Sequence, residues 1–208
     1  MADIALLSIF IPTFFFVSIT PGLCMTLALT MGMTIGVRKT LWMMSGELIG
    51  VGTVAAAAVL GVAAAVAQYP DVFVYLKLCG GAYLAFLGVQ LWLSKGRMAV
   101  RLDDDVAPAQ PRRTELAVQG FVTAIANPKA WAFMISLLPP FIKMDQALIP
   151  QLSQLVAIIL VLELICLLIY ATGGKSLRTF LQSSGNVRML NRIAGTLMVG
   201  VGGWLAFL

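Results

Sequence analysis

Six runs of apolar residues dominate this chain of 208 residues, and their length sets what the chain can fold into. An α-helix needs about 20 apolar residues to cross the hydrocarbon core of a bilayer. The runs cover residues 4–31, 41–67, 72–93, 116–142, 155–172 and 189–208. The first has no basic leader and no small-residue cleavage site, so we expect a retained span rather than a signal peptide. The sequence predicts an all-α integral membrane protein with six transmembrane helices.

The composition excludes most soluble classes of protein. Hydrophobic residues make up 60% of the chain and charged residues 11%, whereas a soluble domain has about 45–50% apolar and about 25% charged residues. A soluble domain of this size buries only about 70% of its unfolded surface, which would leave much of this apolar area in water. The net charge of +5 does not indicate a nucleic-acid partner, because that function needs basic residues clustered on a polar surface.

Side chains that bind metals or carry out catalysis are scarce. There is no histidine, and Cys24, Cys79 and Cys166 lie far apart without a C-x-x-C motif. We therefore expect no metal site, no cofactor and no enzymatic activity.

The basic residues predict an orientation in the membrane. They lie in alternate connections: Arg38 and Lys39 follow the first run, five more lie between the third and fourth, and Lys175, Arg178, Arg188 and Arg192 lie between or beside the last two. The other connections carry Asp71 on one side and Lys143 with Asp145 on the other. Since basic loops stay in the cytoplasm, both termini are predicted outside it, which is the periplasm in a bacterial cell.

The two halves of the chain resemble one unit used twice. A polar stretch over residues 94–115, which includes Asp103–Asp105, reads as a solvated cytoplasmic linker between halves 1–93 and 116–208 of a single transporter domain. Three features recur in order: Thr20-Pro21-Gly22 and Asn127-Pro128-Lys129, then Glu47 and Glu163, then Lys77–Gly80 and Arg192–Gly195. A unit of three helices crosses the membrane in the opposite sense when it is repeated. Inverted repeats are typical of secondary transporters, with the site near the midplane.

The two proline motifs predict spans that are broken at Pro21 and Pro128. Proline removes a backbone N–H and clashes with the preceding turn. Thr20 and Asn127 are suitable N-caps, and proline is favoured at the first helical position. A helix N-terminus inside the membrane would attract a carboxylate. The candidate substrate-binding residues are therefore Thr20, Pro21, Gly22, Asn127, Pro128 and Lys129, although simple kinks at the prolines are an alternative.

Five charged residues lie within the runs. Lys77 and Arg192 are near span ends and can reach the interface, whereas Glu47, Lys129 and Glu163 lie deeper, where charged residues usually face the protein interior or a cavity. Small residues follow Glu47 on its helical face, so Glu47 is expected to point into the bundle. Glu47 is a candidate for binding a substrate ammonium group and, with Glu163, for carrying a coupling proton. The alternative is a permanent ion pair between a glutamate and Lys129.

Several segments resemble the LysE/RhtB family of amino-acid exporters. The matching residues are Phe16–Gly22 with Gly32, Gly36 and Gly46, then Lys77–Gly88, and then Gly120-Phe121, Asn127–Ala130 and Leu138–Ile142. The resemblance covers nearly the whole chain. It implies a six-span protein of the bacterial inner membrane that exports amino acids or related metabolites, driven by the proton gradient. Leu23 and Pro140 depart from the family pattern and leave the substrate open.

Two other functions belong to related six-span folds. A transmembrane thiol electron carrier needs a cysteine pair in equivalent helices, and Trp131 stands where the partner of Cys24 would be. A metal-ion exporter would lack histidine ligands here. The spacings Gly32-x-x-x-Gly36 and Gly46-x-x-x-Gly50 are compatible with a homodimer but favour packing within one chain.

Overall fold

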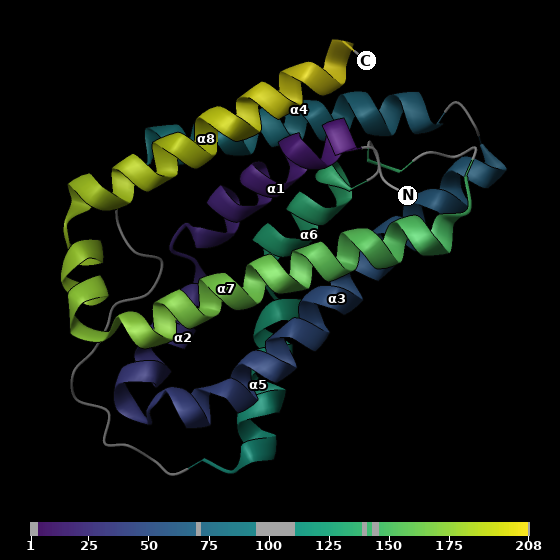
Figure 1. Ribbon diagram of the computed structural model, residues 1–208. Coiled ribbons are helices and arrows are strands. Elements are labelled where there is room, and N and C mark those ends of the chain that lie inside the picture. Colours follow the sequence, from purple (N-terminus) through teal and green to yellow (C-terminus); the bar gives the residue numbers. More distant parts are fainter. Residues whose placement is uncertain (1–3, 70–71, 95–110, 139–140, 143–145, 208) are drawn as a thin grey trace.

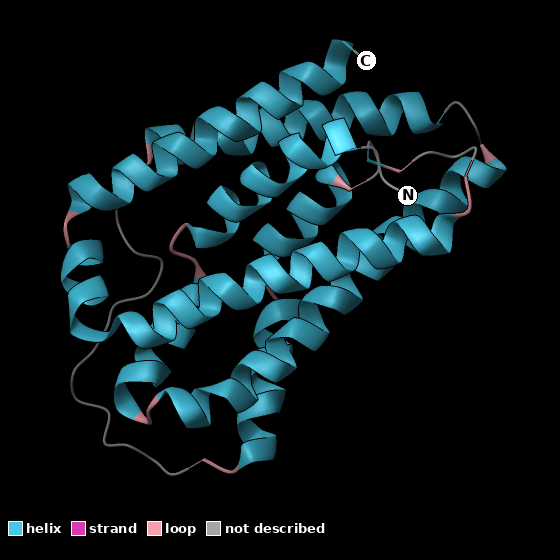
Figure 2. Cartoon of the chain, viewed as in Figure 1, coloured by secondary structure: helices cyan, strands magenta, loops and turns pink. Residues whose placement is uncertain are grey.

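The computed structural model describes residues 4–69, 72–94, 111–138, 141–142 and 146–207. Over these residues the chain is helical, without a strand (Figure 2). The described α-helices are α1 (Ile4–Ile19), α2 (Leu23–Thr34), α3 (Val37–Gln68), α4 (Val72–Leu93), α5 (Arg113–Ile125), α6 (Pro128–Leu137), α7 (Leu148–Gln182) and α8 (Ser184–Phe207). The predicted all-α class is confirmed.

Two helices in the described part of the chain are individually long and apolar enough to cross a membrane. They are α3 over Val37–Val62 and α7 over Leu148–Gly174. Helices α1 and α2 together give a third candidate span, bent by 58°. The arrangement of six spans in two inverted repeats stays a prediction, because the other helices do not meet the same criterion within the described residues.

Parts of the predicted connections lie outside the described residues. These parts are linker residues 95–110, which include Asp103–Asp105, and the loop residues Asp71, Lys143 and Asp145. At its C-terminal end, the predicted linker extends to residue 115, whereas α5 already begins at Arg113. The backbone N–H of Arg112 donates to the Glu115 carboxylate at 2.9 Å, and this contact stabilises the first turn of the helix.

The short helices α1 and α6 lie in the middle of the bundle (Figure 1). Helix α1 packs against α7 and α8, and α6 packs against α3 and α4. Buried aromatic rings join the two helices: Phe14 of α1 lies 5.7 Å from Phe133 of α6, measured between ring centroids. Around this centre, α4 packs along α8, α3 along α5, and α2 along α7. The breaks between α1 and α2 and between α5 and α6 are thereby enclosed by the longer helices.

Glycines allow α3 and α5 to approach closely. A Cβ atom on Gly46 would overlap the carbonyl oxygen of Ala117, and one on Gly120 would overlap that of Met43. Gly32 of α2 meets the backbone of Ala171 in the same way. These small residues serve packing within the chain, as their spacing predicts. The homodimer stays a prediction.

Six exposed basic side chains gather at one end of the bundle, which we call the basic end. Arg38 and Lys39 begin α3, Arg112 and Arg113 lie at the start of α5, and Arg188 and Arg192 follow the start of α8; all are exposed. The beginning of α1 and the end of α8 lie at the opposite end (Figure 1). A charge difference between two ends is the pattern expected of a membrane protein with a fixed orientation.

Candidate functional site

The first break in the bundle is built around the backbone carbonyl that Pro21 leaves unpaired. Proline has no N–H to bond the carbonyl four residues earlier, which belongs to Val17. That carbonyl instead accepts hydrogen bonds from the Thr20 hydroxyl at 2.6 Å and from Lys129 Nζ at 2.7 Å. The Lys129 ammonium group of α6 therefore binds at the end of α1, next to the break.

The predicted role of Thr20 as a helix cap is wrong. Helix α2 begins at Leu23, and its N-cap is Gly22, which is extended with φ −141° and ψ −173°. Pro21 thus lies before the helix rather than at its first position. The Thr20 side chain bonds backwards to the free Val17 carbonyl, which leaves it unable to cap α2.

The second break follows the prediction. Asn127 is the N-cap of α6, and its side-chain oxygen accepts a hydrogen bond from the Lys129 backbone N–H at 3.1 Å. Pro128 is the first residue of the helix. The Asn127 amide also donates to Cys24 Sγ at 3.4 Å. One side chain therefore caps α6 and links it to the first turn of α2.

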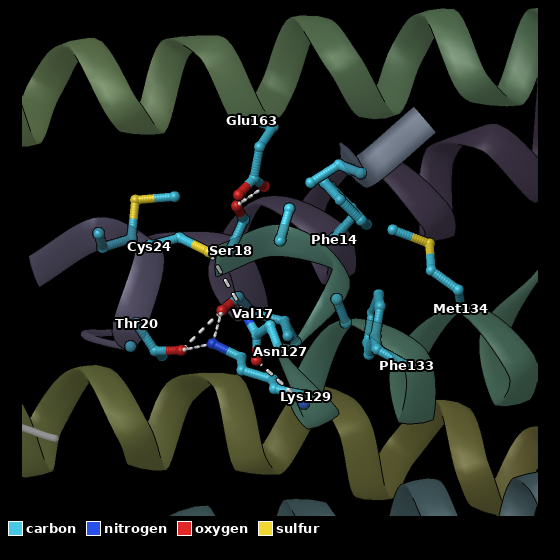
Figure 3. A pocket seen from close by; sticks show the side chains of 15 residues that line it. Phe14, Val17, Ser18, Thr20, Cys24, Asn127, Lys129, Phe133, Met134 and Glu163 are labelled. Carbon is cyan, nitrogen blue, oxygen red and sulfur yellow. Dashed lines mark hydrogen bonds between the residues drawn. The ribbon is translucent and has the colours of Figure 1, made fainter. Parts of the chain in front are cut away.

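Both breaks open onto one cavity of about 60 Å³ at the centre of the bundle (Figure 3). A water molecule needs about 10–15 Å³ of such space, so the cavity has room for several waters. Apart from glycine and alanine, its lining consists of apolar Phe14, Val17, Met25, Val51, Phe133 and Met134 and polar Ser18, Thr20, Cys24, Asn127, Lys129 and Glu163. The structure thus brings both proline motifs and two of the three predicted charged residues together.

A carboxylate and a cation approach the cavity from opposite sides. Glu163 of α7 is buried and accepts a hydrogen bond from the Ser18 hydroxyl. Lys129 of α6 is half-buried and donates to Thr20 Oγ1 at 2.6 Å as well as to the Val17 carbonyl. The two charges form no direct ion pair in this structure, because each contacts polar groups of α1 or the break that follows it. The cavity therefore offers one anionic and one cationic wall.

Glu47 points into the bundle, as predicted, but it does not line this cavity. Its side chain is 0% exposed, and neither carboxylate oxygen has a hydrogen-bond partner among the described residues. Cys24, which does line the cavity, lies beside it and interacts with it electrostatically. Glu47 therefore interacts with a residue that lines the cavity but does not line it itself.

A second cavity, of about 430 Å³, lies on the other side of Lys129. Val17, Lys129 and Phe133 line both cavities. The rest of the second cavity is Pro128 with Tyr83, Leu87, Gln90 and Leu91 of α4 and Met198 of α8. Lys129 therefore forms part of a wall between a small polar space and a larger, mostly apolar one.

Ser18 and Tyr170 are site residues that the sequence did not single out. Ser18 contacts Glu163, and the Tyr170 hydroxyl donates to the Ile19 carbonyl at 2.7 Å. Carbonyls at the end of an interrupted helix need partners from elsewhere. The position of Pro21 therefore signals which carbonyls are free, but it gives no sign of the side chains that reach them.

The family model for the LysE type translocator matches residues 15–208 of this chain. The chain belongs to the LysE-type translocator family. This confirms the resemblance that the sequence motifs indicate. The LysE-type translocator described here is therefore a membrane transporter and not an enzyme.

Curated relatives match nearly the full length of this LysE-type translocator. The homoserine/homoserine lactone efflux protein of Salmonella typhimurium is 27% identical over 192 residues, which cover 91% of this chain and 90% of the relative. An uncharacterised membrane protein of Vibrio cholerae is 26% identical over 190 residues, with the same two coverages. The membrane protein YrhP of Bacillus subtilis is 25% identical over 200 residues, which cover 93% of this chain and 94% of the relative. No solved structure gives a significant match.

Proposed function

We propose that this translocator exports an amino acid or a related small zwitterion across the bacterial inner membrane, in exchange for protons. The observation that carries the proposal is the pair of opposite charges, Lys129 and Glu163, that face one central cavity without neutralising each other directly. A free amino acid carries the complementary pair of charges. The relative named as a homoserine/homoserine lactone efflux protein makes homoserine the first substrate to test.

The substrate carboxylate binds at Lys129 in this proposal. The Lys129 ammonium group donates hydrogen bonds. It can therefore exchange its contacts with Thr20 and the Val17 carbonyl for contacts with the substrate carboxylate. The N-terminus of α6 at Asn127 and Pro128 adds positive partial charge on the same side. Gly22 lines the cavity, and even a Cβ atom at this position would come within 3.9 Å of Lys129 Nζ. Glycine therefore keeps the approach to the lysine open.

The substrate ammonium group binds at Glu163 on the opposite wall. Ser18 holds this carboxylate through its hydroxyl and leaves the other carboxylate oxygen for the ligand. Pro21 and Pro128 bind nothing through a side chain. Their role is to interrupt the helices, so that unpaired backbone groups at the helix ends are available beside the cavity.

Proton coupling is assigned to Glu47, with Glu163 as a second proton-binding group. A buried ionised carboxylate without a hydrogen-bond partner is energetically costly, and protonation removes that cost. Glu47 is fully buried in this way. Because Cys24 links its neighbourhood to the Asn127 cap, a change of charge at Glu47 is felt at the N-terminus of α6.

The same proposal includes six spans in two inverted repeats, with the basic end in the cytoplasm and both termini in the periplasm. The separation of the basic end from the outer ends of α1 and α8 supports this orientation. The breaks at Pro21 and Pro128, one in each half of the chain, support the repeat.

The test is efflux of labelled amino acids from vesicles that contain the purified protein, with and without a pH gradient. Homoserine, threonine and lysine form the first panel. We expect gradient-driven transport by the wild type. Glu163→Gln should bind substrate poorly, and Glu47→Gln should lose gradient-driven transport but keep exchange of labelled for unlabelled substrate, since exchange needs no net proton movement.

The matched control is Glu115→Gln. Glu115 is an exposed glutamate at the third position of α5, where glutamine serves equally well in a capping box. It should transport like the wild type. Full gradient-driven transport by Glu47→Gln would contradict its proton role, and a wild type that moves no member of an extended amino-acid panel would contradict the proposed function.

A further inference from the structure

A pocket of about 190 Å³ lies at the basic end of the bundle, where α4 ends and α8 begins. Its lining is Trp92, Leu93, Ser94, Arg188 and Arg192. It shares no lining residue with the two cavities around Lys129. Its function is therefore not part of the transport site proposed above.

Close antiparallel packing of α4 and α8 builds the walls of this pocket. Gly88 and Gly195 lie so near each other that a Cβ atom on either would overlap the other's carbonyl oxygen. Beyond this contact, the Asn191 amide donates to the Ser94 hydroxyl at 2.6 Å and joins the end of α4 to the second turn of α8. The pocket is thus formed by two helix segments that are fixed to each other, and not by a loop alone.

Two exposed guanidinium groups give the pocket a concentrated positive charge. Arg192 lies over the Trp92 ring, with 4.8 Å from its Cζ atom to the ring centroid. Arg188 precedes it by four residues and lies on the same face of α8. The described carboxylates, Glu47, Glu115 and Glu163, belong to α3, α5 and α7. Within the part of the chain that the structure describes, the arginines are free to receive an anion from outside.

The geometry favours a phosphate group over a small spherical anion. A guanidinium presents paired N–H donors in a plane, which fit two phosphate oxygens at once. Stacking on the indole ring holds Arg192 in one orientation. The Ser94 hydroxyl accepts from Asn191, so its own proton is available to a further oxygen.

The rim of the pocket is apolar. Leu93 is 69% exposed and Trp92 is 45% exposed, side by side at the end of α4. In a membrane transporter, tryptophan at the end of a helix marks the level of the lipid headgroups. A ligand with a phosphate at one end and a hydrocarbon chain at the other matches both halves of this surface.

We propose that this pocket binds an anionic phospholipid, with the phosphate between Arg188, Arg192 and Ser94 and an acyl chain along Leu93 and Trp92. Basic pockets between helices at the cytoplasmic side of a membrane bind such headgroups through charge. The apolar rim argues for the lipid rather than for a soluble phosphate. The bound lipid would join α4 to α8 and so stabilise the transporter.

The test uses purified full-length protein in detergent and native mass spectrometry of its lipid adducts. The probes are phosphatidylglycerol, phosphatidylcholine with the same acyl chains, and glycerol 3-phosphate as a soluble anion. We expect a preference for phosphatidylglycerol over phosphatidylcholine. Each arginine should contribute about fivefold to the apparent affinity, so the Arg188→Gln/Arg192→Gln double variant should bind phosphatidylglycerol roughly 25-fold more weakly. Arg192→Lys keeps the charge but not the planar fork of donors. Its affinity for phosphatidylglycerol should lie between those of the wild type and the double variant.

The control is Arg113→Gln. Arg113 lies 5.3 Å above the Trp42 ring at the same end of the bundle, but this pair lines none of the three cavities. It should leave lipid binding unchanged. Equal losses in Arg113→Gln and the double variant would overturn the proposal, as would equally tight binding of glycerol 3-phosphate. Thermal denaturation without added lipid shows whether the double variant is folded; a folded double variant that still binds phosphatidylglycerol like the wild type also refutes the pocket.

Discussion

Replacing Lys129 with methionine tests whether the cation in the central cavity binds the substrate carboxylate. Methionine keeps most of the length and volume of the side chain but removes its charge and donors. In the structure these donors reach the Val17 carbonyl at 2.7 Å and Thr20 Oγ1 at 2.6 Å. The variant therefore removes two short contacts within the protein and, in our proposal, the partner of the ligand carboxylate.

The effect on stability should be small. A hydrogen bond to a charged group contributes about 1.5–3 kcal/mol. The Val17 carbonyl, however, keeps its bond from the Thr20 hydroxyl, and removing a half-buried cation also removes its desolvation cost. We expect the free energy of unfolding to change by less than about 2 kcal/mol in either direction.

The effect on binding should be large. Truncating one partner of a buried charge pair costs about 2–5 kcal/mol, which is about 30-fold to several-thousandfold in Kd. Binding of labelled substrate to the purified protein, followed by displacement, measures this directly. The carboxamide of the same amino acid lacks the carboxylate. Its affinity, compared with that of the acid, shows whether the carboxylate contributes to binding. Wild type should prefer the acid by more than about tenfold, and Lys129→Met should bind acid and amide alike.

Lys39→Met is the control, since Lys39 is an exposed lysine at the basic end. If Lys129→Met is folded and binds the acid within threefold of wild type, the carboxylate does not bind at Lys129. A variant that loses acid and amide equally would also refute the assignment, because the loss would then be one of cavity shape and not of charge.

Three further predictions follow from the packing and the second cavity. Gly120→Ala should lower stability by about 1–3 kcal/mol, because its Cβ meets the backbone of α3; Gly61→Ala, with nothing within 4 Å, should not, and thermal denaturation in detergent compares them. Asn127→Ala should cost about 1 kcal/mol by removing the cap of α6, whereas Asn127→Asp keeps a capping oxygen; equal melting temperatures would refute the capping role. Gln90→Leu removes an amide from the large cavity behind Lys129, so it should reduce transport of homoserine relative to that of aliphatic amino acids; an unchanged ratio in a competition assay would show that this cavity does not bind the substrate side chain.

Local rules were sufficient for the all-α class and for one of the two breaks. Asn127 caps α6 and Pro128 begins it, because the capping preference depends only on adjacent residues. The same reasoning failed at Thr20, whose hydroxyl had a second partner available in the carbonyl of Val17. A cap competes with other hydrogen bonds, and sequence alone does not rank them.

The sequence also did not identify the glutamate that lines the cavity: it favoured Glu47 for the substrate ammonium group and gave Glu163 only a proton-carrying role. The two occupy corresponding places in the proposed repeats, yet Glu163 lines the central cavity whereas Glu47 interacts with Cys24 and does not line it. A helical pattern predicts which face of a helix is buried. It does not say whether the residue on that face meets a cavity or packed side chains, because that depends on how far the neighbouring helix lies.

The sequence by itself determined the all-α class of the protein, its family and the places where two helices must break. These depend on apolar run length, on charge and on the missing N–H of proline, which act within one helix. Only the tertiary structure decided that Lys129 of α6 meets the carbonyl freed in α1, that Ser18 meets Glu163, and that Arg192 stacks on Trp92 across two helices. Such contacts join residues more than 90 positions apart. They are set by how closely the helices pack, and the small residues that permit close approach do not specify their partners in advance.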